Sequence, residues 1–286
     1  MRRLATMLVV CALAGVATPA RAAVDVDALW NYADPAASET RFRQALAGAT
    51  GDDALVLRTQ IARTYSLRAR FDEAQRELDE IEPALAAAGV ESRVRAWLER
   101  GRTLRSSGKP LEGRPLFQRA YITADAARLE LLAADALHMI ALVEPDLDDR
   151  IAWNRRTVDY ARRASDPKAQ GWDAAALNNI GDDLRKAGRL GESLGAFRDA
   201  LVAYERSGRA DRARIARWQV ANVLRLMGQL DEALSMQSAL EREAQAAGQP
   251  DPFVFDELAL LHAAKGEADK AAQSHARAAA LRAKPR

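Results

Sequence analysis

The chain has 286 residues, 49% hydrophobic and 29% charged, with 42 basic and 40 acidic side chains. Residues 1–22 contain three arginines and no acidic residue, so the remainder has 39 basic against 40 acidic side chains. A balance this even argues against bulk attraction to nucleic acid, because such attraction needs a clear excess of positive charge.

The first 22 residues have the pattern of a secretory signal peptide. Arg2 and Arg3 precede an apolar stretch at 8–17, and Ala20-Arg21-Ala22 has the small residues of a cleavage site. We therefore expect cleavage after Ala22 and export, to the periplasm of a bacterium. The apolar stretch is short for a bilayer span, so retention as a membrane anchor is the less favoured alternative.

Cleavage would also remove Cys11, the single cysteine of the chain. The mature protein would then have no disulfide, no thiol nucleophile and no thiolate metal ligand. Its stability would depend on helix packing alone.

Helix signals fill the rest of the chain. After an irregular lead-in at 23–33, Asp34-Pro35 opens a short helix, with Asp as the N-cap and Pro in the first turn. The same pair recurs at Asp166-Pro167 and Asp251-Pro252. Apolar residues recur at three- and four-residue intervals between turn glycines, and no stretch alternates with period two. The sequence therefore predicts helices and no strand.

One helical-hairpin pattern recurs six times, with a period near forty residues. A small residue in the first helix of each copy marks the register: Ala62, Gly101, Ala141, Gly181, Ala221 and Ala259. A fixed period of this size indicates stacked units, none of which can bury its apolar face alone. The predicted hairpins span residues 54–88, 91–126, 128–164, 168–207, 210–247 and 251–283.

Two hairpins contain irregular positions. In the second, Pro115 would remove an interior hydrogen bond from a helix that began at Pro110, so we expect a kink or a late start. In the third, Glu144-Pro145 should end the first helix early.

The clearest copy has a small residue in its first helix, a large residue three positions later, a turn glycine and a phenylalanine in its second helix. These positions are Ile180-Gly181, Leu184, Gly188, Ser193, Phe197 and Ala200. The pattern resembles the tetratricopeptide repeat family over residues 51–283. The usual period of that family is 34 residues, so this chain is similar to its longer, kinesin-light-chain-type variant.

The resemblance implies an all-α fold, a right-handed superhelical solenoid of about six antiparallel hairpins. We expect a signal peptide at 1–22, a lead-in and capping helix at 23–50 and the repeat domain at 51–286. The first helix of each hairpin should line the concave face.

Catalytic and metal-binding motifs are not found. The sequence has no glycine-rich phosphate loop, serine nucleophile elbow or metalloprotease helix, so we expect neither an enzyme nor a cofactor. His262 and His275 of the last hairpin are expected to pack together rather than bind zinc. The acidic cluster at 144–149 lacks the glycine and the final glutamate of a calcium loop, and Asp is a common helix cap.

Recognition is the better candidate function. The expected concave face carries Arg63 and His138, and its candidate partner-binding residues are Arg102, Arg105, Asn178, Asp182, Arg185, Trp218, Asn222 and Arg225. Asn178 and Asn222 lie in the middle of predicted helices, where Asn has poor propensity and no cap to make. The resemblance implies that such asparagines bond the backbone of a bound peptide.

Trp218 with its neighbouring arginines has the composition of a binding hot spot. The alternative is that its ring packs between adjacent hairpins.

We expect a non-enzymatic exported scaffold that binds a peptide or protein segment in its concave groove. The arginines favour an acidic segment or a C-terminal carboxylate. The alternative is a periplasmic sensory or regulatory domain that binds a small envelope ligand such as a glycan fragment. The sequence supports neither a nucleic-acid partner nor a stable membrane span.

Overall fold

The structure, a computed structural model, describes residues 24–283, which form fifteen α-helices and no strand. Two of the helices have a single turn, α1 (Val26–Leu29) and α9 (Pro167–Gln170). The predicted signal peptide at 1–22 lies outside the described residues. Within the described part of the chain, no helix is long and apolar enough to cross a bilayer.

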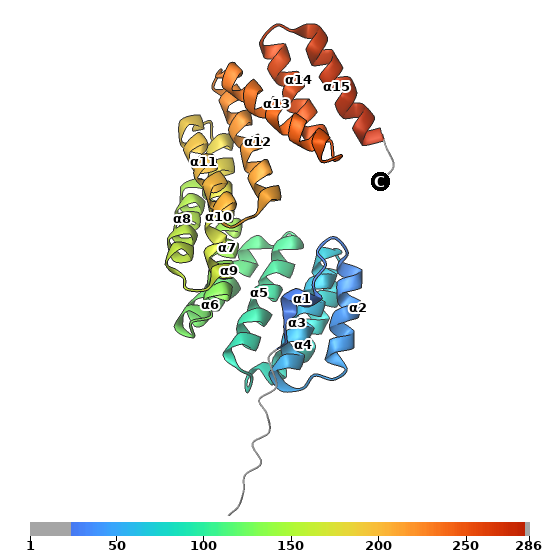
Figure 1. Cartoon of the computed structure of the whole chain (residues 1–286). Coiled ribbons are helices and arrows are strands. Elements are labelled where there is room, and N and C mark those ends of the chain that lie inside the picture. The colour runs from blue at the N-terminus through green and yellow to red at the C-terminus, as the bar shows by residue number, and fades with distance from the viewer. Residues whose placement is uncertain (1–23, 284–286) are drawn as a thin grey trace, which may run out of the picture.

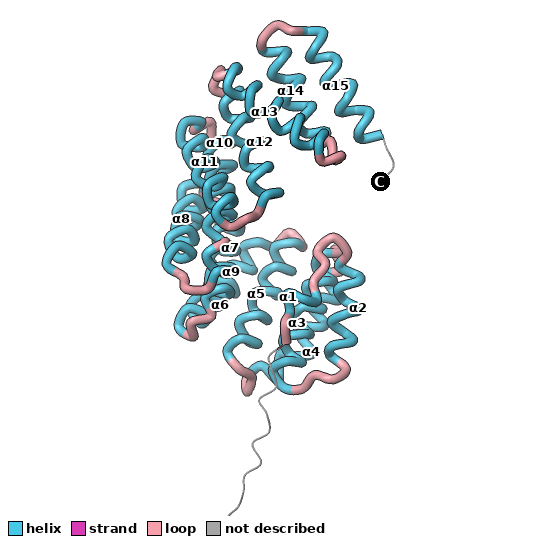
Figure 2. Tube along the Cα trace, in the orientation of Figure 1, coloured by secondary structure: helices cyan, strands magenta, loops and turns pink. Residues whose placement is uncertain are grey.

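A capping helix and six antiparallel hairpins make up the rest of the fold. They stack in chain order into a curved superhelix (Figures 1 and 2). The capping helix is α2 (Pro35–Leu46), and the hairpins are α3 (Gly51–Leu67) with α4 (Phe71–Leu85), α5 (Val90–Ser106) with α6 (Pro110–Ala126), α7 (Glu130–Val143) with α8 (Leu147–Arg163), α10 (Trp172–Lys186) with α11 (Leu190–Arg206), α12 (Ala210–Leu226) with α13 (Leu230–Ala246), and α14 (Pro252–Ala264) with α15 (Ala268–Ala283). The predicted all-α solenoid is confirmed.

Aspartate caps begin several of these helices where the sequence predicted them. The side chains of Asp34, Asp166 and Asp251 accept backbone N–H bonds at 2.9, 2.8 and 2.9 Å. Asp146, from the acidic cluster, caps α8 in the same way, at 2.9 and 3.0 Å. Each bond satisfies a donor that the first turn of a helix otherwise leaves unpaired.

In the second and fourth hairpins, the small residue of the first helix lies against the second helix of the same hairpin. A Cβ atom added to Gly181 would lie 2.7 Å from the ring of Phe197, and one added to Gly101 would lie 2.5 Å from the ring of Phe117. Ser193 also donates a hydrogen bond to the Gly181 carbonyl oxygen, at 2.7 Å. Glycine thus lets the two helices approach closely, and the predicted register is confirmed.

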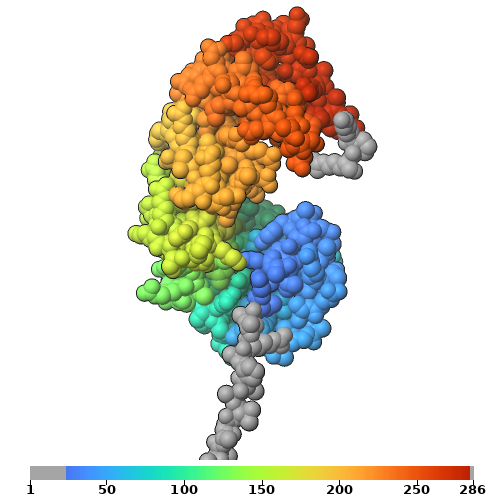
Figure 3. All heavy atoms as spheres, viewed as in Figure 1, coloured from blue at the N-terminus to red at the C-terminus, as the bar shows by residue number. Residues whose placement is uncertain are grey.

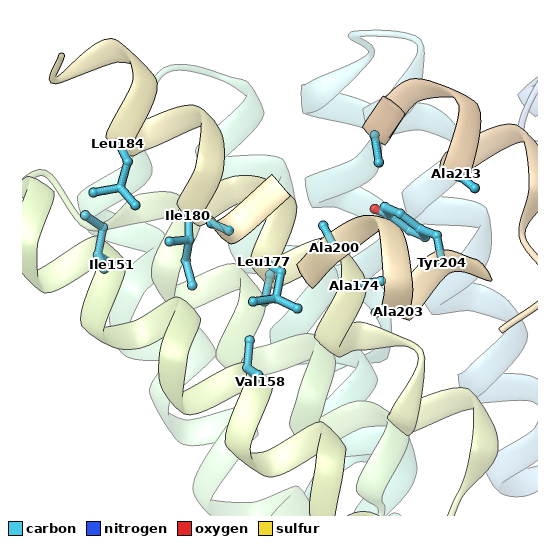
Figure 4. Close-up of a cluster of buried hydrophobic side chains, with 13 residues drawn as sticks. Ile151, Val158, Ala174, Leu177, Ile180, Leu184, Ala200, Ala203, Tyr204 and Ala213 are labelled. Carbon is cyan, nitrogen blue, oxygen red and sulfur yellow. The ribbon is translucent and has the colours of Figure 1, made fainter. Parts of the chain in front are cut away.

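The core continues across hairpin boundaries. Ile151 and Val158 of α8 pack with Leu177 and Ile180 of α10, and Figure 4 shows these side chains meeting between the two helices. Each hairpin therefore buries its apolar face against its neighbours, as stacked repeats require.

For the helix that contains Pro115, the sequence predicted a kink or a late start. Helix α6 begins at Pro110 and continues through Pro115, so the late start does not occur. The hydrogen bond that Pro115 removes would end on the carbonyl of Leu111, a residue that is 59% exposed. The early end of α7 at Val143, before Glu144-Pro145, is confirmed.

Candidate partner-binding surfaces

Arg102 of α5 belongs to a buried ion-pair network. Its guanidinium bonds Glu99 of its own helix and Asp135 of α7. Arg63 of α3 reaches the same Glu99 oxygen at 3.4 Å. Burial alone would raise the pKa of Asp135, but the Arg102 charge outweighs it and lowers that pKa, so the carboxylate stays ionised. Arg102 therefore joins the second and third hairpins, and Arg63 extends the network to the first.

Arg105, one turn further along α5, is exposed, and within the described residues it forms no ion pair. Its charge acts on His138 of α7, a residue expected on the concave face. His138 is half-buried: its ring lies 4.8 Å from the ring of Trp172, and its Nδ1 atom lies 3.5 Å from the Asn179 amide nitrogen. Burial lowers the pKa of His138 to about 4, so the ring is neutral at pH 7.

The candidates on α10 remain accessible. Asp182 bonds Arg185 at 2.7 Å and Lys186 at 2.6 Å, both within one helix. Burial would raise the pKa of Asp182, but these two cations lower it. Asn178 is half-buried, and in the described part of the chain its side chain has no hydrogen bond. Asn178, Asp182 and Arg185 can therefore meet a ligand.

The candidates on α12 instead join it to α14. The Asn222 amide donates to Glu257 at 3.0 Å, and Arg225 donates to the other oxygen of that buried carboxylate at 2.6 Å. Trp218 donates to the Phe253 carbonyl oxygen at 3.1 Å and packs on Leu240. Trp218 thus packs between adjacent hairpins, the alternative considered for it, while part of its ring stays exposed.

An apolar groove lies beside Trp218. This hollow of about 770 Å³ is bounded by α12, the end of α13 and the start of α14. Ile215 and Phe253 on its walls remain 47% and 63% exposed. Neither residue is among the candidates that the sequence predicted. The sequence does contain a pattern that relates them: Ile215 and Phe253 each lie six residues before the small residue of their helix, Ala221 and Ala259.

A second, polar hollow of about 620 Å³ lies in the first turn of the superhelix. Arg95 of α5 and Asp135 of α7 line it, and each lies six residues before the small residue of its helix, the repeat position that Ile215 and Phe253 hold at the apolar groove. The contact between Asp27 and Lys168, 141 residues apart, closes one edge. Figure 3 shows the blue N-terminal elements close to the yellow-green middle hairpins there.

The histidines of the last hairpin do not pair. His262 Nδ1 lies 2.6 Å from Glu267 Oε2, and His275 is exposed, so their expected contact is not found. Among residues 24–283, no group of three or more His, Cys, Asp or Glu side chains is arranged to hold a metal ion.

Comparison with known proteins agrees with this geometry. A tetratricopeptide repeat model matches residues 174–207, which are the fourth hairpin. A search of curated proteins finds no match to the sequence.

Several solved structures share the fold. A signal transduction ATPase with a tetratricopeptide repeat sensor, from Pyrococcus horikoshii, gives a TM-score of 0.71 at 11% identity, over 86% of this chain and 39% of that one. BtubC from P. vanneervenii gives 0.64 at 17% identity, over 77% and 94%. A Rap protein complexed with competence and sporulation factor gives 0.56 at 14% identity, over 83% and 67%.

These likenesses concern the fold. This chain spans 39% of the length of the Pyrococcus protein. Together with the repeat match at the fourth hairpin, they confirm the tetratricopeptide-repeat resemblance that the sequence indicated.

Proposed function

We propose that this protein is a non-enzymatic scaffold that binds a segment of another protein on the concave side of its solenoid. The observation that carries the proposal is the apolar groove, where the exposed side chains of Ile215 and Phe253 flank Trp218. Monomeric proteins rarely leave a large continuous apolar surface open, and aromatic side chains supply much of the affinity at protein interfaces.

Accessible polar residues also lie on the first helices of other hairpins, α5 and α10. Asn178 of α10 can bond a peptide backbone, and Arg105 and Arg185 favour acidic residues in the bound segment. We infer that Arg102, Asn222 and Arg225 act indirectly, because their bonds to buried carboxylates fix the helices that carry the surface. The Rap protein of the same fold is itself complexed with competence and sporulation factor, which supports this use of the scaffold.

Site-specific photo-crosslinking tests the proposal. Phe253 is replaced by p-benzoylphenylalanine, which keeps an aromatic ring at the groove, and Ile122 on α6 is replaced in the same way as a control. Ile122 is 67% exposed, so both probes meet solvent equally well. We expect one defined protein to crosslink at position 253 and not at 122. Equal labelling at both positions, or none at 253, would contradict the proposal.

We also propose that the chain is exported to a periplasm after cleavage behind Ala22, as its signal-peptide pattern predicts. Intact-mass measurement of the protein from the envelope fraction tests this. A mass that begins at Ala23 supports the proposal, whereas a mass that retains Met1 to Ala22 indicates an anchored protein.

A further inference from the structure

The polar hollow is enclosed by elements far apart in the chain. Its walls come from the N-terminal segment with α1, from α3, α5 and α7, and from α9 with the start of α10. The contact between Asp27 and Lys168 joins the two ends of this ring. A volume of about 620 Å³ falls within the range of small-molecule sites, on the order of 300–1,000 Å³.

One buried acceptor in this wall has no protein donor. Asp135 is 9% exposed, and its Oδ2 atom bonds Arg102. Its Oδ1 atom is buried and has no hydrogen-bond partner among the described residues. A buried, ionised oxygen without a donor is costly, so this atom calls for a hydroxyl or N–H group from a ligand.

The charges of the hollow leave no surplus for a charged ligand. Three of its four cations are already paired with carboxylates: Arg63 with Glu99, Arg95 with Glu91, and Lys168 with Asp27. The fourth cation is Arg209, and the carboxylate of Asp25, which caps α1, balances its charge in the lining of the hollow. A net ionic charge would enter without a counter-charge and lose its hydration, so a neutral polar ligand fits better.

Aromatic rings supply apolar faces in the same hollow. The Tyr32 ring stacks on Trp30 at 4.6 Å with one face, yet Tyr32 remains 59% exposed, so its other face is open. Trp172 lines the opposite side, where His138 supports its ring. Guanidinium donors, a carboxylate acceptor and open aromatic faces together match a ligand with many hydroxyl groups and an apolar ring face.

We propose that the polar hollow binds a neutral sugar of two or three rings. A hydroxyl group donates to the Asp135 carboxylate, Arg63 or Arg209 donates to other hydroxyl oxygens, and one sugar face packs on Tyr32. This site is separate from the apolar groove, so either proposal can fail without the other.

Calorimetric titration of the full chain with defined sugars tests the site. The neutral probes are maltose, maltotriose and N,N′-diacetylchitobiose, and the charged probes are glucosamine and gluconate. We expect saturable binding of at least one neutral probe and none of the charged ones. Tyr32→Ala should weaken that binding by about tenfold or more, because it removes the stacking face, while Tyr32→Phe should retain it.

Phe253→Ala is the matched control for specificity. Its ring is also exposed but lies in the apolar groove, so it should leave sugar affinity unchanged, and Tyr32→Ala should leave protein capture unchanged. No saturable binding of any neutral probe, tighter binding of a charged probe, or equal affinity in Tyr32→Ala would each overturn the assignment. Loss of protein crosslinking at position 253 would bear on the proposed scaffold alone.

Discussion

At Gly181 the missing side chain is what allows α10 to pack against the ring of Phe197. Gly181→Ala would place a Cβ atom 2.7 Å from that ring, and Phe197 is fully buried and cannot move aside. We expect Gly181→Ala to destabilise the protein by about 1–3 kcal/mol. Chemical denaturation followed by circular dichroism measures the change.

Gly195→Ala is the matched control, because Gly195 also lies inside a helix but no atom stands within 4 Å of the place that its added Cβ would take. It should stabilise the protein by about 0.5–1 kcal/mol, the difference in helix propensity between the two residues. Similar changes in both variants would show that Gly181 does not hold the close contact.

Because of His138, we expect the stability of the fold to depend on pH in the mildly acidic range. Its pKa of about 4 lies below the unfolded value near 6.5, so the unfolded chain binds more protons between these pH values. Stability should therefore fall as pH drops through this window, by about 1–2 kcal/mol from pH 7 to pH 5. The facing Asp135, whose pKa is lowered, loses its charge only at more acidic pH.

Denaturation at pH 7 and pH 5 checks this prediction against His138→Gln. The variant cannot titrate there, so it should lose less stability on acidification than the wild type. Equal losses in the two proteins would mean that His138 is solvated like an ordinary surface histidine.

The sequence specified residue roles well where the contact lies within one hairpin. Gly181 and Phe197 are 16 positions apart, and the repeat pattern relates them directly. The repeat pattern does not reveal that Asn222 and Arg225 bond Glu257, because that residue belongs to the next hairpin. It likewise does not reveal that Trp172, from a later element, lies against His138.

Between elements, a buried carboxylate joins hairpins five and six. Glu257 of α14 is 2% exposed, and Arg225 of α12 supplies its counter-charge. Arg225→Ala would leave the Glu257 carboxylate buried, with the Asn222 amide as its remaining hydrogen-bond donor. We therefore expect the free energy of unfolding to fall by about 3–5 kcal/mol, more than for removal of a surface arginine. Thermal and chemical denaturation measure it.

Arg185→Ala provides the comparison for Arg225→Ala. Its pair with Asp182 lies within one helix and is roughly 30% exposed on both sides, so its removal should cost at most about 1 kcal/mol. If the two variants lost the same stability, the Glu257 contact would not hold the last hairpin in place.

Element boundaries were predictable because capping and turn residues act locally. Asp34, Asp146 and Asp251 cap the helices that their sequence positions indicated. The course of α6 through Pro115 was not predictable, because Pro115 removes one hydrogen bond close to the start of the helix and the local sequence does not show whether the helix tolerates that loss.

Across the whole molecule, the concave side changes character along the superhelix. In the first turn it forms a polar hollow around Asp135 and Tyr32, and near the C-terminus it forms an apolar groove around Ile215 and Phe253. The repeat pattern predicted the concave face but not this change. The polar hollow is built from elements far apart in the chain, and the spacing of one repeat does not encode which of them meet.

The central claim is that the apolar groove binds a segment of a partner protein. Once crosslinking at position 253 has identified the partner, calorimetry compares its affinity for the wild type, Phe253→Ala and Ile122→Ala. Both side chains are exposed, so both variants should keep their stability within about 0.5 kcal/mol. We predict that Phe253→Ala weakens binding by about tenfold or more while Ile122→Ala leaves it unchanged. Equal affinity in all three proteins would contradict the account.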